Sequence, residues 1–160
     1  MWQEFIDVMS KLLETYKAML RVSKDKRKVL VQVDMTALED LLTKEQSLIA
    51  TVGKLEKERE IVLQKIAAAE HIIEPMAKMT DLFSLCSNKE AAVLKNIHEE
   101  LNTIVAQVTE NSATNELLIS GALSAVNYNL NRLSDASVGN TYAAEGKETV
   151  LKTKKFDFKA

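Results

Sequence analysis

The sequence predicts an all-α protein: a long antiparallel helical hairpin, a short connector helix, a third long helix and a C-terminal tail. The 160 residues include four Gly, one Pro and 5% aromatic residues, which is well below the usage of sheet-rich domains. Apolar residues recur every three or four positions over long stretches, as they do on a helix packed along one face. Two of these stretches begin at a Ser or Thr placed three residues before a Glu, the spacing of a capping box.

The first helix is expected at about residues 3–31. Its apolar row alternates in steps of three and four, with Thr15 and Lys26 at two polar places. The row consists of Phe5, Val8, Leu12, Met19, Val22, Val29 and Val33. It is widened by Met9, Leu13, Tyr16 and Leu20. A stripe of this width indicates a helix that faces a core.

The second helix is expected at about residues 36–73, starting at the capping-box pair Thr36 and Glu39. Its apolar seam is an unbroken alternation of three- and four-residue steps over about five heptads. The seam consists of Leu38, Leu41, Glu45, Leu48, Val52, Leu55, Arg59, Val62, Ile66, Ala69 and Ile73. Glu45 and Arg59 interrupt it, and we interpret them as residues that set helix register rather than as catalytic groups.

A connector helix is expected at 76–85, because Pro75 suits a first helical turn and apolar residues then share one face. Ser87 and Glu90 form the second capping box and predict a third long helix over about 88–133. The first half of that helix has a regular apolar seam, made of Leu94, Ile97, Leu101, Ile104 and Val108.

Residues 109–116 are almost wholly polar and place Asn111 and Asn115 where the seam would otherwise carry Leu. Beyond this gap, apolar order resumes in a row that we call the C-terminal stripe: Ile119, Leu123, Val126, Leu130 and Leu133. Crossing the gap takes three consecutive steps of four, which departs from the heptad. The two halves of the third helix therefore need not face the same partner.

The domain prediction is one helical bundle over residues 1–134 and a mobile tail over 135–160. In the tail the helical pattern ends in Ser, Gly and Asn, and the last twelve residues alternate apolar side chains with Lys. Such a segment carries too little apolar surface to form a core of its own.

Charge and composition argue against several classes of partner. A formal charge of −2 and a pI near 5.8 provide no overall attraction to nucleic acid or to an anionic membrane. Met1 to Arg21 contain no uncharged apolar run, and Cys86 is the only cysteine, so neither a signal peptide nor an internal disulfide is expected. We expect a cytoplasmic protein without membrane insertion.

No combination of acid, base and nucleophile indicates an enzyme, and we expect no metal and no cofactor. His71 and His98 lack the spacings of di-iron and zinc helices. Cys86 is interpreted as a small buried hydrophobe rather than a nucleophile. The face carrying Lys17 to Lys28 is interpreted as solvated, with a docking strip for an acidic partner as the alternative.

Four segments together resemble the FlgN family of flagellar type III export chaperones, which hold hook-associated proteins as unassembled monomers. They match a second-helix pattern, an Asn-x-Leu-Leu signature, a Tyr-x-x-x-Gly element and a terminal hydrophobic-Asp-x-basic-Ala pattern of that family. The segments are LLTKEQSLIATVGKLEKERE at 41–60, Asn115 with Leu117 and Leu118, TYAAEGKET at 141–149, and FDFKA at 156–160. The connector over 76–86 is longer, and the tail richer in Lys, than is usual for the family.

The resemblance implies a chaperone that delivers hook-associated proteins to the flagellar export machinery by binding their C-terminal helical segments. Client binding would then involve the C-terminal stripe with Asn115, Leu117 and Leu118. Docking of the tail would involve Tyr142, Gly146, Phe156 and Phe158. The alternative is a structural coiled-coil or adaptor module without a client, in which the same helix makes a homodimer.

Overall fold

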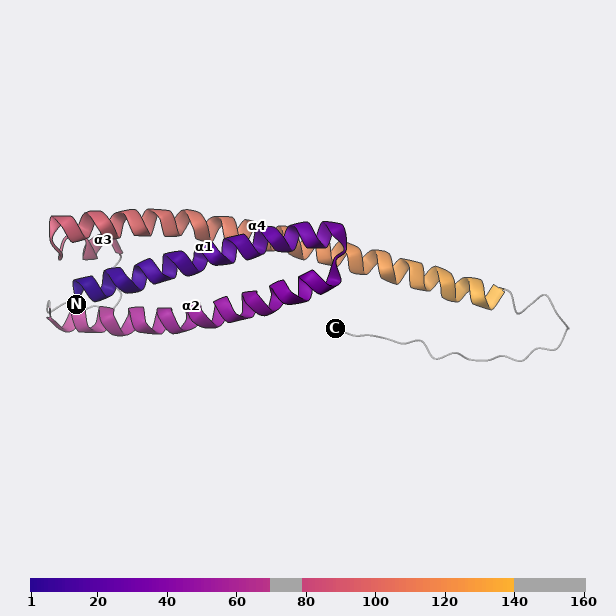
Figure 1. The fold of residues 1–160 in the computed structure, drawn as a ribbon, viewed down its shortest axis with the longest axis horizontal. Coiled ribbons are helices and arrows are strands. Elements are labelled where there is room, and N and C mark those ends of the chain that lie inside the picture. The colour runs from indigo at the N-terminus through magenta and orange to yellow at the C-terminus, as the bar shows by residue number, and fades with distance from the viewer. Residues whose placement is uncertain (70–78, 140–160) are drawn as a thin grey trace. The chain divides into compact units, whose positions relative to one another are not determined.

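The computed structural model describes residues 1–69 and 79–139, and within these the chain is helical and contains no strand. The prediction of an all-α protein is confirmed. The helices are α1 (Trp2–Gln32), α2 (Met35–Ala69), α3 (Met79–Leu82) and α4 (Asn88–Gly139) (Figure 1). The chain forms two compact units, Met1–Ser120 and Gly121–Ala160. The predicted tail residues from Tyr142 onward lie outside the described residues.

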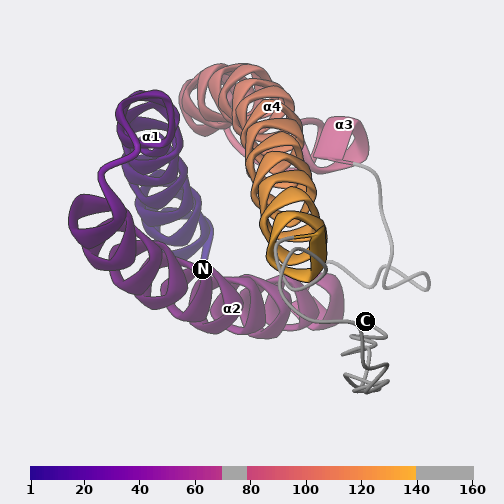
Figure 2. The same ribbon diagram turned by 90° about the vertical axis from the view of Figure 1, so that its right-hand side faces the viewer.

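In the first unit, α1 and α2 form an antiparallel hairpin, and α4 runs beside α1 in the same direction as α1 (Figures 1 and 2). Ion pairs mark both contacts: Lys65 of α2 lies 3.0 Å from Glu4, and Glu100 of α4 lies 2.8 Å from Lys17. Helix α1 is therefore the central helix of this unit.

The hydrophobic core lies where α1 and α4 begin and α2 ends. Phe5, Leu12, Ile66 and Leu94 are all 0% exposed, and Leu82 of α3 joins the same cluster. Each fully buried side chain of this size stabilises the fold by roughly 1.5–3 kcal/mol. The predicted seam of α2 is buried or half-buried from Leu38 to Ile66, which confirms its register.

The turn between α1 and α2 corrects the predicted start of the second helix. Val33 adopts the left-handed conformation, and the amide of Asp34 donates to the Val29 carbonyl at 3.0 Å, which closes α1. The carboxylate of Asp34 then accepts from the amide of Ala37 at 3.0 Å. Asp34, rather than Thr36, thus caps α2, and the helix begins at Met35.

The region around α3 differs from the prediction, whereas the capping box that follows is confirmed. Within the described residues the connector is a single turn, Met79–Leu82, instead of a helix over 76–85. At the start of α4, the amide of Ser87 donates to Glu90 at 3.0 Å, and the amide of Glu90 donates to the Ser87 hydroxyl at 3.4 Å. Helix α4 continues past Leu133 to Gly139, so 135–139 are helical.

Candidate interaction surface

The seam of α4 continues through the polar segment that interrupts the apolar pattern. Leu94 and Ile97 are buried, and Leu101, Ile104 and Val108 are half-buried. The same alternation of three and four residues then reaches Asn111, Asn115 and Leu118, of which Asn115 is only 2% exposed. Polar residues thus occupy seam positions of α4 and remain covered.

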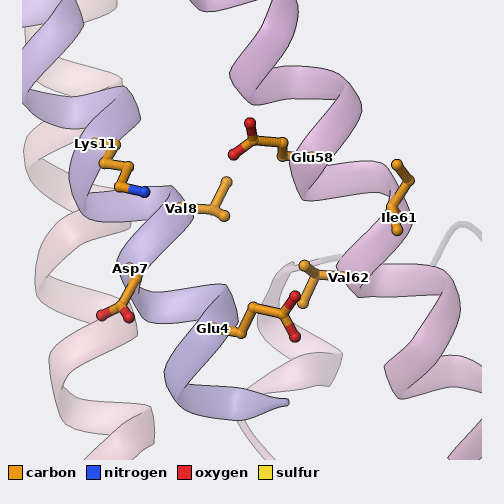
Figure 3. A pocket seen from close by; sticks show the side chains of 7 residues that line it. All are labelled: Glu4, Asp7, Val8, Lys11, Glu58, Ile61 and Val62. Atoms are coloured by element: carbon orange, nitrogen blue, oxygen red, sulfur yellow. The ribbon is translucent and has the colours of Figure 1, made fainter.

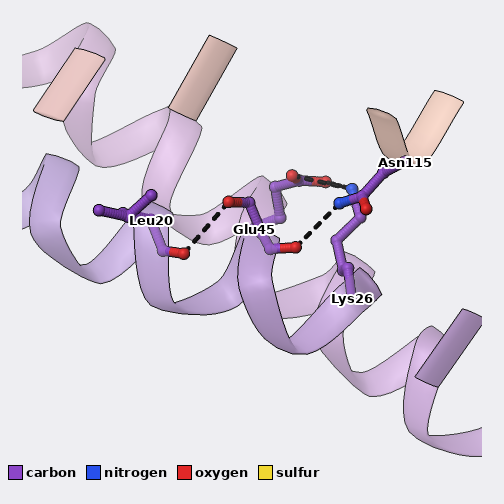
Figure 4. A network of polar contacts seen from close by, with 5 residues as sticks. Leu20, Lys26, Glu45 and Asn115 are labelled. Carbon is purple, nitrogen blue, oxygen red and sulfur yellow. Dashed lines mark hydrogen bonds and ion pairs between the residues drawn. The ribbon is translucent and has the colours of Figure 1, made fainter. Parts of the chain in front are cut away.

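Asn115, for which the family resemblance implies a place in client binding, is buried against α1 in the free chain. Its Nδ2 donates to the backbone carbonyl of Ser23 at 2.9 Å, and the Ser23 hydroxyl donates to the Leu20 carbonyl at 3.1 Å (Figure 4). Its Oδ1 is buried without a hydrogen-bond partner among the described residues. A hydrogen bond contributes about 1 kcal/mol, whereas an unpaired buried acceptor costs about 1–3 kcal/mol.

A buried ion pair lies in the same polar region. Nζ of Lys26, a residue that is 8% exposed, lies 2.7 and 2.9 Å from the two carboxylate oxygens of Glu45 (Figure 4). The Glu45 position in the α2 seam therefore faces a cation on α1, as expected for a residue that sets helix register. Arg59 instead pairs with Glu56 of its own helix at 2.7 Å.

Sequence reasoning missed Ser23, although a signal for it exists in α1. A second row runs beside the predicted one in the same steps of three and four and ends at this serine. The row is Ile6, Met9, Leu13, Tyr16, Leu20 and Ser23, all buried or half-buried. Two adjacent rows are the pattern of a helix that packs against two others.

The C-terminal stripe is exposed. Ile119 is 37% exposed, and the remaining members of the stripe, which lie in the second unit, are 54–68% exposed. No charged residue occurs between Glu116 and Arg132. Single exposed apolar residues are ordinary, but a row of them on an uncharged helix segment is typical of an interaction site.

Leu117 and Leu118 do not share the side of α4 that carries the stripe. Each residue turns a helix by about 100°, so Leu117 lies about 200° around the axis from Ile119. Leu117 is 74% exposed and Leu118 is half-buried along the seam. One partner helix lying along the stripe would therefore not contact Leu117.

A hollow between α1 and α2 is a weaker candidate for a functional site than the C-terminal stripe. It has a volume of about 420 Å³ and is lined by Glu4, Asp7, Val8, Lys11, Glu58, Ile61 and Val62 (Figure 3). The Glu4 carboxylate pairs with Lys65, and Asp7 accepts a hydrogen bond from Gln3 at 2.9 Å. Among the described residues, no group of three or more His, Cys, Asp or Glu could hold a metal ion.

His98 and Cys86 pack beside α3. The His98 ring meets Phe83 edge-on with 6.3 Å between ring centroids, and its Nε2 lies 3.1 Å from the Asn102 amide. Cys86 is half-buried, and burial, followed by the nearby Glu90 carboxylate, raises the pKa of its thiol. A raised pKa lowers the thiolate fraction, which is unfavourable for a nucleophile.

The basic face of α1 is partly neutralised. Lys17 pairs with Glu14 of its own helix at 3.1 Å as well as with Glu100 of α4, and Lys28 pairs with Asp25 at 2.9 Å. Hydrogen bonds to Glu100 and then to Glu14 raise the pKa of Lys17. Lys17 thus links α1 to α4 at the protein surface.

Comparison with known proteins identifies the family. A family model described as FlgN protein matches residues 1–149, which include all four helices. No curated protein and no solved structure matches the chain. None of the helices in the described ranges is long and apolar enough to cross a membrane. Since the family match covers most of the 160 residues, the chain belongs to the FlgN family of flagellar export chaperones.

Proposed function

We propose that this protein is a cytoplasmic export chaperone that binds the C-terminal helical segments of hook-associated proteins and delivers these proteins, as monomers, to the flagellar type III export apparatus. Family membership supports the class of function. The observation that carries the binding site is the exposed C-terminal stripe of α4. The protein acts by binding alone, as a non-enzyme without metal or cofactor.

The stripe suits an amphipathic helix as its ligand. Ile119, Leu123, Val126, Leu130 and Leu133 follow steps of three and four, so a client helix with the same spacing would pack along them. Because this segment of α4 carries no charge, binding would bury apolar area without removing water from an ion. Covering the apolar face of the client would also keep the client from self-association.

We propose a smaller client-binding set than the one that the family resemblance implies. Asn115 is buried in the free chain, and Leu117 lies around the helix from the stripe. We therefore assign client binding to the stripe and leave out Leu118, which lies about 100° around the helix from Ile119. Tyr142, Gly146, Phe156 and Phe158 stay proposed contacts to the client or the export machinery.

The test is a double substitution in the stripe. Leu123→Ala with Leu130→Ala should weaken binding of a purified hook-associated protein by about 2 kcal/mol or more, measured by calorimetry. The melting temperature should be unchanged, because the two side chains are 59% and 58% exposed. The matched control is Leu117→Ala with Tyr128→Ala, two side chains that are 74% and 62% exposed.

Two outcomes would contradict the proposal. Equal loss of affinity in the control variant would mean that the stripe is not the binding site. If light scattering shows that Leu123→Ala with Leu130→Ala converts a dimer into a monomer, and neither form binds a hook-associated protein, the protein is a homodimeric coiled-coil module.

A further inference from the structure

Asn115 is a residue that stability alone does not explain. It occupies a seam position, is 2% exposed, and leaves Oδ1 without a partner among the described residues. A leucine in this position would bury apolar surface and leave no unpaired acceptor. An unpaired buried group in a native structure calls for a role other than packing.

The contact between α1 and α4 becomes weaker along the helices. At its start, Leu94 and Ile97 are buried in the core cluster. Farther along, the Asn111 amide donates to the Gln107 carbonyl of its own helix at 2.8 Å, so this bond does not involve α1. Over 108–118, the bond from Asn115 to Ser23 is the interhelical hydrogen bond to α1 within the described residues.

Separation of α4 from α1 over this stretch would uncover polar groups on α1 beside the buried Leu20, whereas Val108, Asn111 and Leu118 on α4 are only half-buried. Ser23 has a hydroxyl, and Lys26 would keep both of its contacts to Glu45, because that pair joins α1 to α2 (Figure 4). Water can solvate such groups, in contrast to the apolar core around Leu94. Local opening therefore costs less here than at the start of α4.

Asn115 also lies on the side of α4 that carries Ile119, the first residue of the C-terminal stripe. It precedes Ile119 by four residues, and Leu123 follows after four more. Side chains spaced by four residues are neighbours on one side of a helix. The covered seam thus ends beside Ile119, where the stripe begins.

We propose that residues 108–118 of α4 are a latent extension of the partner-binding surface. In the free chain α1 covers these residues, and in the complex a partner helix replaces α1. The partner is an amphipathic helix that presents apolar side chains to the stripe and a hydroxyl or amide group to Asn115. An apolar group opposite Asn115 would leave both ends of its amide unpaired, which disfavours partners that lack the polar residue. The inference rests on the proposed function of the stripe.

Hydrogen exchange followed by mass spectrometry tests the opening without any partner. Amides of 108–118 should exchange at least about tenfold faster than those of 94–104. Asn115→Leu should slow that exchange, and Asn115→Ala should accelerate it while exchange in α2 stays unchanged. Asn102→Ala is the matched control, because Asn102 is exposed, lies outside 108–118 and contacts His98 of its own helix. Equal protection of the two segments in the unmodified protein would overturn the proposal.

Binding of a purified hook-associated protein tests the surface. Asn115→Leu should lower affinity at least about tenfold, and Asn102→Ala, an exposed position outside 108–118, should leave affinity unchanged. If the Leu123→Ala and Leu130→Ala variant loses binding but Asn115→Leu does not, the latent surface is wrong and the proposed function stands. If neither variant loses affinity, both are wrong. If Asn115→Leu does not fold, hydrogen exchange of the Asn115→Ala variant is the test. Faster exchange of the amides of 108–118 supports the proposal, and unchanged exchange overturns it.

Discussion

At the residue scale, the two charged side chains in the interior of this bundle are tolerated because they pair with each other. Lys26 and Glu45 carry opposite charges from facing helices, with side chains that are 10% and 21% exposed. A pair of this kind adds little to stability compared with apolar packing, but removal of one partner leaves a buried charge. The pair therefore disfavours other alignments of α1 and α2 more than it stabilises the observed one.

Loss of one member of the Lys26–Glu45 pair should destabilise the protein. We expect Glu45→Leu to lower the free energy of unfolding by on the order of 3 kcal/mol, because it leaves the Lys26 ammonium buried without a counter-charge. The double variant Lys26→Met with Glu45→Leu should recover most of that loss. Glu56→Leu, which removes the partner of Arg59 at the surface, should cost less than about 1 kcal/mol. Urea unfolding measures all three, and equal losses for Glu45→Leu and Glu56→Leu would contradict the prediction.

The buried face of α2 can be tested by charge insertion. Leu55 is 7% exposed, so Leu55→Asp should lower the free energy of unfolding by several kcal/mol out of a total of about 5–15 kcal/mol. Leu48→Asp should cost less, because Leu48 is only half-buried. Ile49→Asp, at a side chain that is 54% exposed, serves as the control. Circular dichroism melting that ranks Ile49→Asp as the most harmful would show that the buried face is assigned wrongly.

At the element scale, side-chain caps determine where the helices start. Asp34 satisfies a free amide at the start of α2, and Ser87 with Glu90 does so reciprocally at the start of α4. The Glu90 carboxylate accepts hydrogen bonds from the Ser87 hydroxyl and amide, and these bonds lower its pKa. Its charged form is therefore favoured in the folded state.

The capping box at α4 should make part of the stability depend on pH. Because the folded-state pKa of Glu90 lies below its ordinary value of 4.5, its contribution is present above pH 4.5 and is lost as the pH falls through the folded-state pKa. NMR titration should give a Glu90 pKa below 4.5 in the native protein and a higher pKa in the Ser87→Ala variant, which loses the hydroxyl bond but keeps the bond from the backbone amide. A Glu90 pKa that Ser87→Ala does not change would exclude the capping bond as the cause.

At the scale of the whole molecule, the first unit contains a packed core and the second presents exposed helix surface. Among the residues whose burial is described, the buried apolar ones all belong to Met1–Ser120. In the second unit, every side chain from Gly121 to Ser134 is exposed. A division of this kind suits the proposed function, because the core of the first unit does not include the surface proposed to bind the partner.

Deletion of the tail tests this division. Truncation after Gly139 removes residues that the sequence predicts to be too sparsely apolar to form a core. The melting temperature should stay within about 2 °C of that of the full chain, since a lost contact of 1 kcal/mol would shift it by more. Export of hook-associated proteins should fall if Tyr142, Phe156 and Phe158 contact the client or the export machinery. A lower melting temperature together with tighter client binding would instead show that the tail covers the stripe.

Most of the secondary structure could be predicted because helix periodicity and capping are local properties of the chain. The seam of α2 from Leu38 to Ile66 and the box of Ser87 with Glu90 needed only nearby residues. Asp34 was missed because it stands two residues before Thr36, and both residue types cap helices. Only the conformation at Val33 decides which of the two stands at the start of α2.

The sequence by itself determined the helical class, the registers and the exposed stripe, because apolar spacing specifies which side of a helix is covered. It does not specify what covers that side. In the sequence, the polar residue Asn115 interrupts the apolar seam. The tertiary structure nevertheless buries it against Ser23, which is 92 residues away in the chain. Burial of a polar residue depends on a partner brought close by the fold. Only the tertiary structure therefore shows that Asn115, just before the exposed stripe, is buried.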